Sequence, residues 1–291
     1  MRLKCFFHPC LLVVWATLAT IAPHVSAQPS IPDKYKTNGF ALGCQAYTFN
    51  RFSAFEAIEK TAQAGGKVIE FYPGQKLSAD SPNLKVDHNA PEEVVTKLQA
   101  KLAEHGLKAV NYGVVGVPND EAGARKVFDF AKKLGLRAIT TESVESIDLL
   151  EKLAKEYDIA VAFHNHPRQP KNPKYRVWDP NYIAEITSGR DPRIGSCADT
   201  GHWVRSGLQP VDCLKILKGR VISSHLKDLD KMAPDGHDVP FGTGVSDIKG
   251  CLTELKAQGF AGNISIEYEY NWDNSVPEVT ECVNFVKKFA P

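Results

Sequence analysis

The sequence lacks an excess of charge of either sign, and this absence narrows the class of partner. Its 291 residues include 35 lysines and arginines against 34 acidic residues, a net charge of +1. Proteins that bind nucleic acid usually carry a basic surface that neutralises phosphates. The 43% hydrophobic and 24% charged residues are those of a globular protein and exclude collagenous, low-complexity and disordered chains. We therefore expect a folded protein that does not bind nucleic acid.

The cysteines lack the spacing of a zinc finger or of a small disulfide framework. Five of them follow residue 27, namely Cys44, Cys197, Cys213, Cys251 and Cys282. They are widely spread and odd in number, whereas disulfide frameworks have paired and closely spaced cysteines. We expect buried free thiols.

The sequence also lacks an apolar run long enough for a typical membrane span. The uncharged segment Leu11–Ala22 follows a basic start and precedes the small residues Val25-Ser26-Ala27. A spanning helix needs ~20 apolar residues, whereas this arrangement is typical of a cleavable secretory signal. We predict a signal peptide over 1–27, a mature chain that begins at Gln28 without a membrane span, and export to the periplasm or the extracellular medium.

From about residue 40 onward, short apolar segments alternate with amphipathic helical segments. The predicted strands are Ala41–Phe49, Val68–Tyr72, Lys108–Val115, Ala138–Glu142, Ile159–His164, Ile194–Asp199, Val221–Lys227 and Ile264–Glu269. Predicted helices include Phe55–Ala64, Glu92–His105, Ala122–Leu134 and Ile147–Tyr157. Eight such repeats predict one α/β domain, a (β/α)8 TIM barrel over 38–291, after an N-terminal extension over 28–37. An open doubly wound sheet is the alternative, but Gly43-Cys44-Gln45 is not the glycine-rich turn that such a sheet usually carries.

Acidic and histidine side chains gather at the predicted carboxyl ends of the strands, where TIM barrels place their active sites. They are Glu142, Asp199, Glu267 and Glu269, together with His164, His166, His202, His225 and His237. Carboxylates that end apolar strands are costly to bury unless they are paired or bind a metal. Carboxylates with imidazoles suit one divalent ion such as Mn2+, Co2+, Zn2+ or Mg2+, and the lack of thiolates argues against a structural zinc site.

Four motifs in order extend these observations. They are Asp199-Thr200-Gly201-His202-Trp203, Ser224-His225-Leu226-Lys227-Asp228, His237-Asp238-Val239-Pro240-Phe241-Gly242-Thr243-Gly244 and Ser265-Ile266-Glu267-Tyr268-Glu269. Over residues 38–290, the chain resembles the xylose isomerase-like barrel superfamily and its sugar phosphate isomerase/epimerase members. The resemblance implies one divalent ion held by a glutamate, an aspartate, a histidine and a second glutamate.

Carried over by motif, the last three ligands are Asp199, His225 and Glu267. The first glutamate of epimerases usually ends the fifth strand before an asparagine, but this sequence has Phe163-His164-Asn165-His166 there. We predict that Glu142, the nearest free carboxylate, is the fourth ligand, with His164 as the alternative. This departure argues against simple epimerisation between two facing glutamates.

The family chemistry begins with removal of a proton next to a carbonyl group, which a metal makes acidic. We predict Glu267, His164 and His166 as catalytic residues, since an imidazole with an unperturbed pKa of ~6.5 exchanges protons near neutral pH. Predicted substrate contacts are His202, Trp203, Lys227, His237 and Glu269. The Lys227-Asp228 pair is also compatible with a solvated ion pair at the rim. Gly242-Thr243-Gly244 fits a tight turn before a helix N-cap better than a phosphate cradle.

These features predict a metal-dependent isomerase or epimerase that acts on an unphosphorylated sugar or glycoside. A metal-dependent lyase or hydratase of 3-keto-glycosides is the alternative, followed by a sugar-binding barrel without catalysis. The superfamily also contains an apurinic endonuclease branch, which the near-neutral charge disfavours. Assembly into a homo-oligomer is left open.

Overall fold

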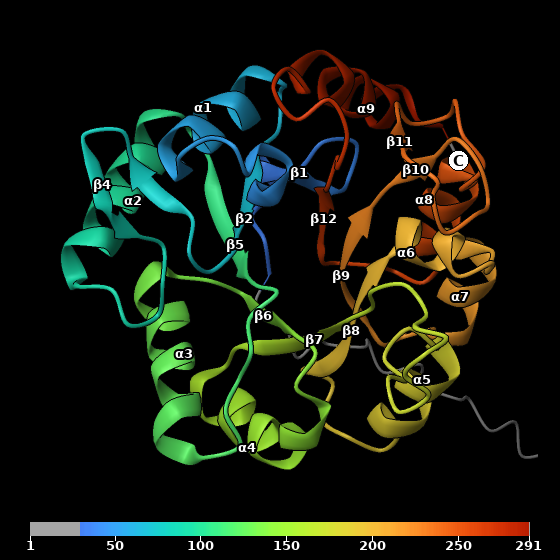
Figure 1. Cartoon of the computed structure of the whole chain (residues 1–291), viewed down its shortest axis with the longest axis horizontal. Coiled ribbons are helices and arrows are strands. Elements are labelled where there is room, and N and C mark those ends of the chain that lie inside the picture. The colour runs from blue at the N-terminus through green and yellow to red at the C-terminus, as the bar shows by residue number, and fades with distance from the viewer. Residues whose placement is uncertain (1–29, 291) are drawn as a thin grey trace, which may run out of the picture.

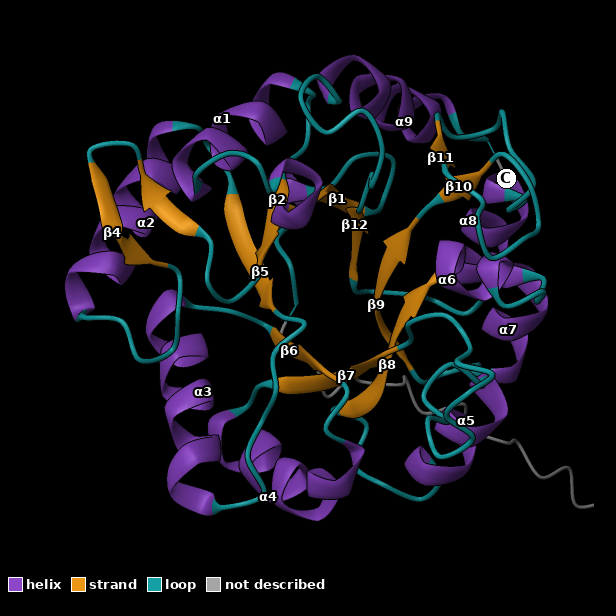
Figure 2. Ribbon diagram, in the orientation of Figure 1, coloured by secondary structure: helices purple, strands orange, loops and turns teal. Residues whose placement is uncertain are grey.

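The chain folds as a closed parallel barrel surrounded by helices, as the alternation of segments predicts. The computed structural model describes residues 30–290. Helices surround the central ring of strands in Figures 1 and 2, and the strand order around the ring is β1-β12-β9-β8-β7-β6-β5-β2. The barrel strands are β1 (Ala41–Gln45), β2 (Val68–Phe71), β5 (Lys108–Tyr112), β6 (Ala138–Thr141), β7 (Ala160–His164), β8 (Ile194–Asp199), β9 (Val221–Leu226) and β12 (Asn263–Ile266).

The helices follow the strands along the chain and include the four predicted ones. They are α1 (Ala54–Gln63), α2 (Glu92–Glu104), α3 (Glu121–Leu134), α4 (Ile147–Tyr157), α5 (Pro180–Thr187), α6 (Thr200–Arg205), α7 (Pro210–Ile216), α8 (Ile248–Ala257) and α9 (Val276–Lys288). Short 3-10 helices cover Asp33–Tyr35, Ala46–Phe49 and Val144–Ser146.

Local sequence signals set several of these bounds. Helix α1 begins after Ser53, whose hydroxyl accepts from the backbone N–H of Glu56 while the Glu56 carboxylate accepts from the N–H of Ser53. Helix α3 ends at Gly135, which has a φ of 70°. In β1, a Cβ on Gly43 would lie 1.6 Å from the carbonyl oxygen of Val68, so that only glycine permits this approach.

Several predicted strands extend too far, and two hairpins outside the barrel were not predicted. Strand β1 gives way to a 3-10 helix at Ala46, and β12 ends at Ile266, so that Glu267 and Glu269 follow the strand. The first hairpin pairs β3 (Lys76–Ser78) with β4 (Ser81–Lys85), and the second pairs β10 (Asp228–Leu229) with β11 (Asp238–Val239). The first is polar and largely exposed and the second has two-residue strands, so neither shows a strand's hydrophobic pattern.

A residue that precedes the barrel packs against the amino ends of β1 and β2. Ile31, which precedes the barrel, packs with Ala41, Val68 and Val110. The five cysteines of the described chain are buried free thiols, as predicted. In residues 30–290, no helix has the length and apolarity of a membrane span. The predicted signal peptide over 1–27 lies outside the described residues.

Candidate active site

A cavity of about 300 Å³ opens at the carboxyl ends of the strands. Its walls come from loops and strand ends around much of the barrel: Gln45, Tyr47, Tyr72, Pro73, Gly113, Val114, His164, His166, His202, Glu267 and Glu269. Five of the predicted site residues are among them. The cavity therefore lies at the end of the barrel where the sequence analysis places the site.

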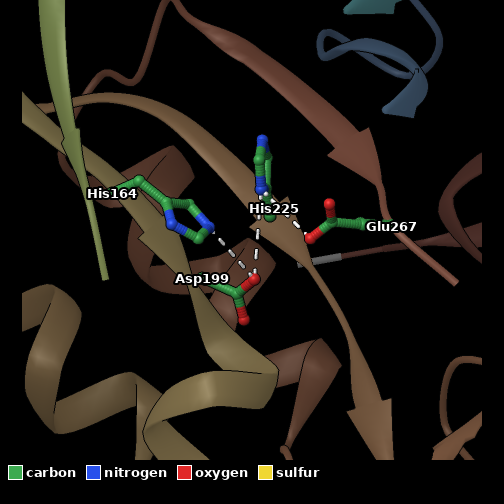
Figure 3. A group of neighbouring side chains, drawn as sticks. All are labelled: His164, Asp199, His225 and Glu267. Atoms are coloured by element: carbon green, nitrogen blue, oxygen red, sulfur yellow. Dashed lines mark ion pairs between the residues drawn. The ribbon is translucent and has the colours of Figure 1, made fainter. Parts of the chain in front are cut away.

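Four buried side chains converge beside this cavity (Figure 3). His164 ends β7, Asp199 ends β8, His225 lies in β9 and Glu267 follows β12, and one ligand atom from each lies within 4.8 Å of the others. The Nε2 atom of His164 is 3.5 Å from Oδ2 of Asp199, and Nδ1 of His225 is 3.2 Å from Oε2 of Glu267. Neighbouring strands thus present two imidazoles and two carboxylates to one point.

This group fits a divalent ion. Within the described residues, both ring nitrogens of His164 and Nδ1 of His225 are buried without a hydrogen-bond partner, and Oδ2 of Asp199 has none apart from its ion pair with Lys227. Buried polar atoms normally have such partners, so these atoms are suited to coordinate a ligand. Nitrogen and oxygen donors of this kind bind Zn2+, Mn2+, Co2+ and related ions.

Glu142 lies beside this group rather than within it, and it does not join Asp199, His225 and Glu267. Its Oε1 atom contacts Nδ1 of His166 and accepts a hydrogen bond of 3.0 Å from the Tyr175 hydroxyl, which hold the carboxylate away. Burial alone would raise the pKa of Glu142, but the two imidazoles of His164 and His166 lower it to about 2. The structure therefore groups the alternative, His164, and not Glu142 with Asp199, His225 and Glu267.

Lys227 is fully buried among the carboxylates of the site. Its Nζ atom lies 2.7 Å from Glu267, 2.7 Å from Glu269 and 3.2 Å from Asp199. Burial alone would lower the pKa of Lys227, but these three negative charges raise it well above its usual value. The interpretation as a solvated ion pair is wrong, and the ammonium does not line the cavity as a substrate contact would.

Asp228, the other member of that pair, is also buried and binds a loop. Its Oδ2 atom accepts from the backbone N–H groups of Gly242 (2.8 Å) and Gly244 (3.0 Å), and its Oδ1 atom accepts from that of Ser246 (3.0 Å). Asp247 caps helix α8 by accepting from the N–H of Gly250. The turn and N-cap are confirmed, and a protein carboxylate occupies the amides that a phosphate would need.

The remaining predicted substrate contacts divide into two sets. His202 and Glu269 line the cavity. Trp203 does not, because it packs in the hydrophobic core with 1% of its surface exposed. His237 lies outside the cavity lining, where its ring contacts that of Tyr270 in a tilted arrangement with centroids 4.3 Å apart. The predictions for Trp203 and His237 are therefore not supported.

Glu70 is a site residue that the sequence analysis missed. It lies in β2, is fully buried, and its Oε2 atom is 3.1 Å from Nε2 of His225. The available signal was a charged residue between the apolar Ile69 and Phe71, inside a strand. A buried carboxylate at such a place requires partners.

Comparison with known proteins agrees with this geometry. Residues 58–288 match the family model described as xylose isomerase-like TIM barrel. The chain belongs to this family. A crystal structure of an uncharacterized protein from Parabacteroides distasonis ATCC 8503 shares 32% identity, with a TM-score of 0.69, over 87% of this chain and 100% of that one. No protein of curated function matches the sequence.

More distant members of known structure share the fold. A D-allulose 3-epimerase from Methylomonas sp., solved in complex with D-allulose, has a TM-score of 0.63 and 16% identity over 90% of this chain and 100% of its own. A sugar phosphate isomerase/epimerase from Parabacteroides distasonis ATCC 8503 has a TM-score of 0.64 and 14% identity over 89% of this chain and 99% of its own. At this identity, the likeness concerns the barrel alone.

Proposed function

We propose that this protein is a divalent-metal-dependent sugar isomerase or epimerase that moves a proton at the carbon next to a carbonyl group. The main support is the group of four buried donors beside the cavity, formed by His164, Asp199, His225 and Glu267. These residues would hold one Mn2+, Co2+, Zn2+ or Mg2+ ion. When bound, the ion would polarise the carbonyl group and a neighbouring hydroxyl, which makes the adjacent C–H acidic.

Side chains that line the cavity would transfer the proton. His166 is half exposed there, and the Glu142 carboxylate holds its Nδ1 atom. This contact leaves Nε2 of His166 to exchange a proton with the substrate. Glu267 supplies a carboxylate on the cavity wall, and His202 and Glu269 are placed to bind sugar hydroxyls.

The substrate that these surroundings favour carries no phosphate group. Among the described residues that line the cavity, none is a lysine or an arginine. The amides of Gly242, Gly244 and Ser246 are engaged by Asp228. Phosphate recognition usually requires free amides or cationic side chains. We therefore propose a neutral sugar or glycoside.

Elimination or hydration of a 3-keto-glycoside is the second candidate reaction. The observation that favours it is His164, an imidazole that stands with the other donors where an epimerase would carry a glutamate. His166, held by Glu142, could then protonate a leaving group instead of returning a proton to carbon. Both reactions share removal of the proton next to the carbonyl.

Solvent deuterium tests the shared step. Metal-loaded protein is incubated in D2O with free ketoses and, separately, with 3-keto-glycosides, and the products are followed by NMR. We expect deuterium at the carbon next to the carbonyl. Interconversion of free sugars supports the isomerase, and release of the aglycone supports the lyase. Deuterium in neither substrate nor product across a broad panel contradicts both.

Three variants connect the exchange to named side chains. Glu267→Gln should abolish deuterium uptake, because it removes a ligand charge and a carboxylate from the cavity wall. His166→Asn should slow uptake by about 10²-fold or more while the protein still binds metal, since it removes only a proton donor. His237→Asn is the matched control, because His237 lies outside the cavity lining, and it should leave uptake unchanged.

We also propose that the protein acts outside the cytoplasm. The support is the sequence of residues 1–27, with its basic start, apolar run and small residues before Gln28. Amino-terminal sequencing of periplasmic or secreted protein should find Gln28 at the start. An intact Met1 in soluble cytoplasmic protein would contradict the proposal.

A further inference from the structure

A fully buried carboxylate contacts the site from inside the barrel. Glu70 in β2 has no exposed surface and does not line the cavity. Its Oε1 atom is 2.7 Å from the Thr140 hydroxyl, and its Oε2 atom is 3.1 Å from both the Ser265 hydroxyl and Nε2 of His225. Three separate strands thus direct polar hydrogens at one carboxylate.

The direction of these hydrogen bonds follows from their partners. The side-chain N–H of Asn263 donates to the Ser265 hydroxyl oxygen at 3.0 Å, so the Ser265 proton is free to point at Glu70. The Thr140 hydroxyl likewise donates to Oε1 of Glu70. An ionised carboxylate only accepts hydrogen bonds, so the third partner, Nε2 of His225, must carry a proton.

A proton on Nε2 determines what the other ring nitrogen can do. The Nδ1 atom of His225 faces the opposite way, 3.2 Å from Glu267 and 3.9 Å from Asp199, and has no hydrogen-bond partner in residues 30–290. A neutral imidazole with its proton on Nε2 has its lone pair on Nδ1. We propose that Glu70 is a positioning residue that fixes His225 in this tautomer, so that Nδ1 binds the divalent ion.

This inference rests on the proposed metal site and adds a residue outside the cavity to it. The other imidazole, His164, has no comparable support, since its Nδ1 atom is 3.7 Å from a Glu142 oxygen that already contacts His166 and Tyr175. Carboxylates that hold a metal-binding histidine typically contribute 10- to 100-fold to metal affinity. We expect a loss of about this size when the Glu70 charge is removed.

Zinc affinity provides the first test, measured by competition with a chromophoric chelator on the whole chain. Glu70→Gln should bind Zn2+ about 10- to 100-fold more weakly than the unmodified protein. Gln keeps the size of Glu and can still accept from Nε2, so the loss reports the charge. Thr140→Val is the matched control, because it removes another partner of the same carboxylate and leaves His225 untouched. This variant should bind Zn2+ within about threefold of the unmodified protein, since it breaks one hydrogen bond to Glu70 and keeps the Glu70 charge and its contact with His225.

The second test needs no variant. In zinc-loaded protein with 15N-labelled histidine, His225 should show a protonated Nε2 and a metal-bound Nδ1. A zinc-bound Nε2, or an affinity of Glu70→Gln equal to that of the unmodified protein, would overturn the role of Glu70 while leaving the metal site in place. If the unmodified protein binds no divalent ion, the proposed metal site fails, and this inference fails with it.

Discussion

Removing the Lys227 ammonium should destabilise the metal-free protein far more than the metal-loaded one. Lys227 is fully buried, and its Nζ atom lies within 3.2 Å of three carboxylates, those of Asp199, Glu267 and Glu269. Removing one partner of a buried ion pair typically costs about 3–5 kcal/mol, because the remaining charge is left without compensation. Lys227→Met, which keeps much of the side chain's length, should therefore lose about that much stability in EDTA.

A divalent ion changes this balance. Asp199 and Glu267 both belong to the proposed ligand group, and Arg205 still contacts Glu269 at 3.0 Å. The ion would supply positive charge to the two carboxylates that lose the ammonium. We expect the difference between Lys227→Met and the unmodified protein to shrink when metal is added in excess.

The assay is urea unfolding followed by circular dichroism, with each protein measured in EDTA and in saturating Zn2+. In thermal unfolding, the same loss of stability corresponds to a Tm lower by about 10 °C for a domain of this size. Lys231→Met is the matched control, because Lys231 is exposed and pairs with the exposed Asp235 on the same loop, and it should unfold like the unmodified protein. Equal midpoints for Lys227→Met and the unmodified protein in EDTA would refute this reasoning.

Two further predictions concern the loop beside the site. Asp228→Ala should cost about 3–5 kcal/mol, because one buried and two part-buried backbone amides lose a charged acceptor, and hydrogen exchange at Gly242, Gly244 and Ser246 should accelerate. Unchanged exchange there would contradict the role given to Asp228. Burial raises the pKa of Asp238 from 3.8 to about 7, against the charges of Lys227 and Arg205. The folded protein therefore binds the Asp238 proton more tightly than the unfolded chain does. The stability that comes from this difference is complete below pH 3.8 and is lost as the pH rises through 7. The stability of Asp238→Asn relative to the unmodified protein should therefore rise by up to about 4 kcal/mol between pH 4 and pH 8, and a constant difference in urea unfolding would contradict the shift.

The barrel could be predicted from the sequence because its signals are local. The apolar segments that become β7 and β8 end at His164 and Asp199, and the residues that end strands of a barrel meet at one rim. Periodicity also located α3 and α4 to within one residue at each end. These features depend on a few neighbouring residues and not on contacts across the barrel.

The details of the site depend on such distant contacts and could not be predicted. Whether Glu142 or His164 joins Asp199 is decided by Tyr175 and His166, which engage the Glu142 carboxylate. Lys227 has the sequence surroundings of a rim residue, yet its ammonium is buried and pairs with three carboxylates from other parts of the chain. Trp203 lies in a motif with two site residues, but its position on helix α6 turns it into the core. The role of Glu70 depends on side chains of β6, β9 and β12, strands that do not pair with β2, and no local pattern contains these contacts.

Location of the metal tests the central claim most directly. Crystals of the purified protein grown with Zn2+ or Mn2+ would be measured at the absorption edge of the ion. We expect one anomalous peak among His164, Asp199, His225 and Glu267, which for Zn2+ should lie about 2.0–2.1 Å from Nε2 of His164 and from Nδ1 of His225. A peak between Glu142 and His166 instead, or no peak in crystals grown with a saturating excess of the ion, would contradict the proposed metal centre.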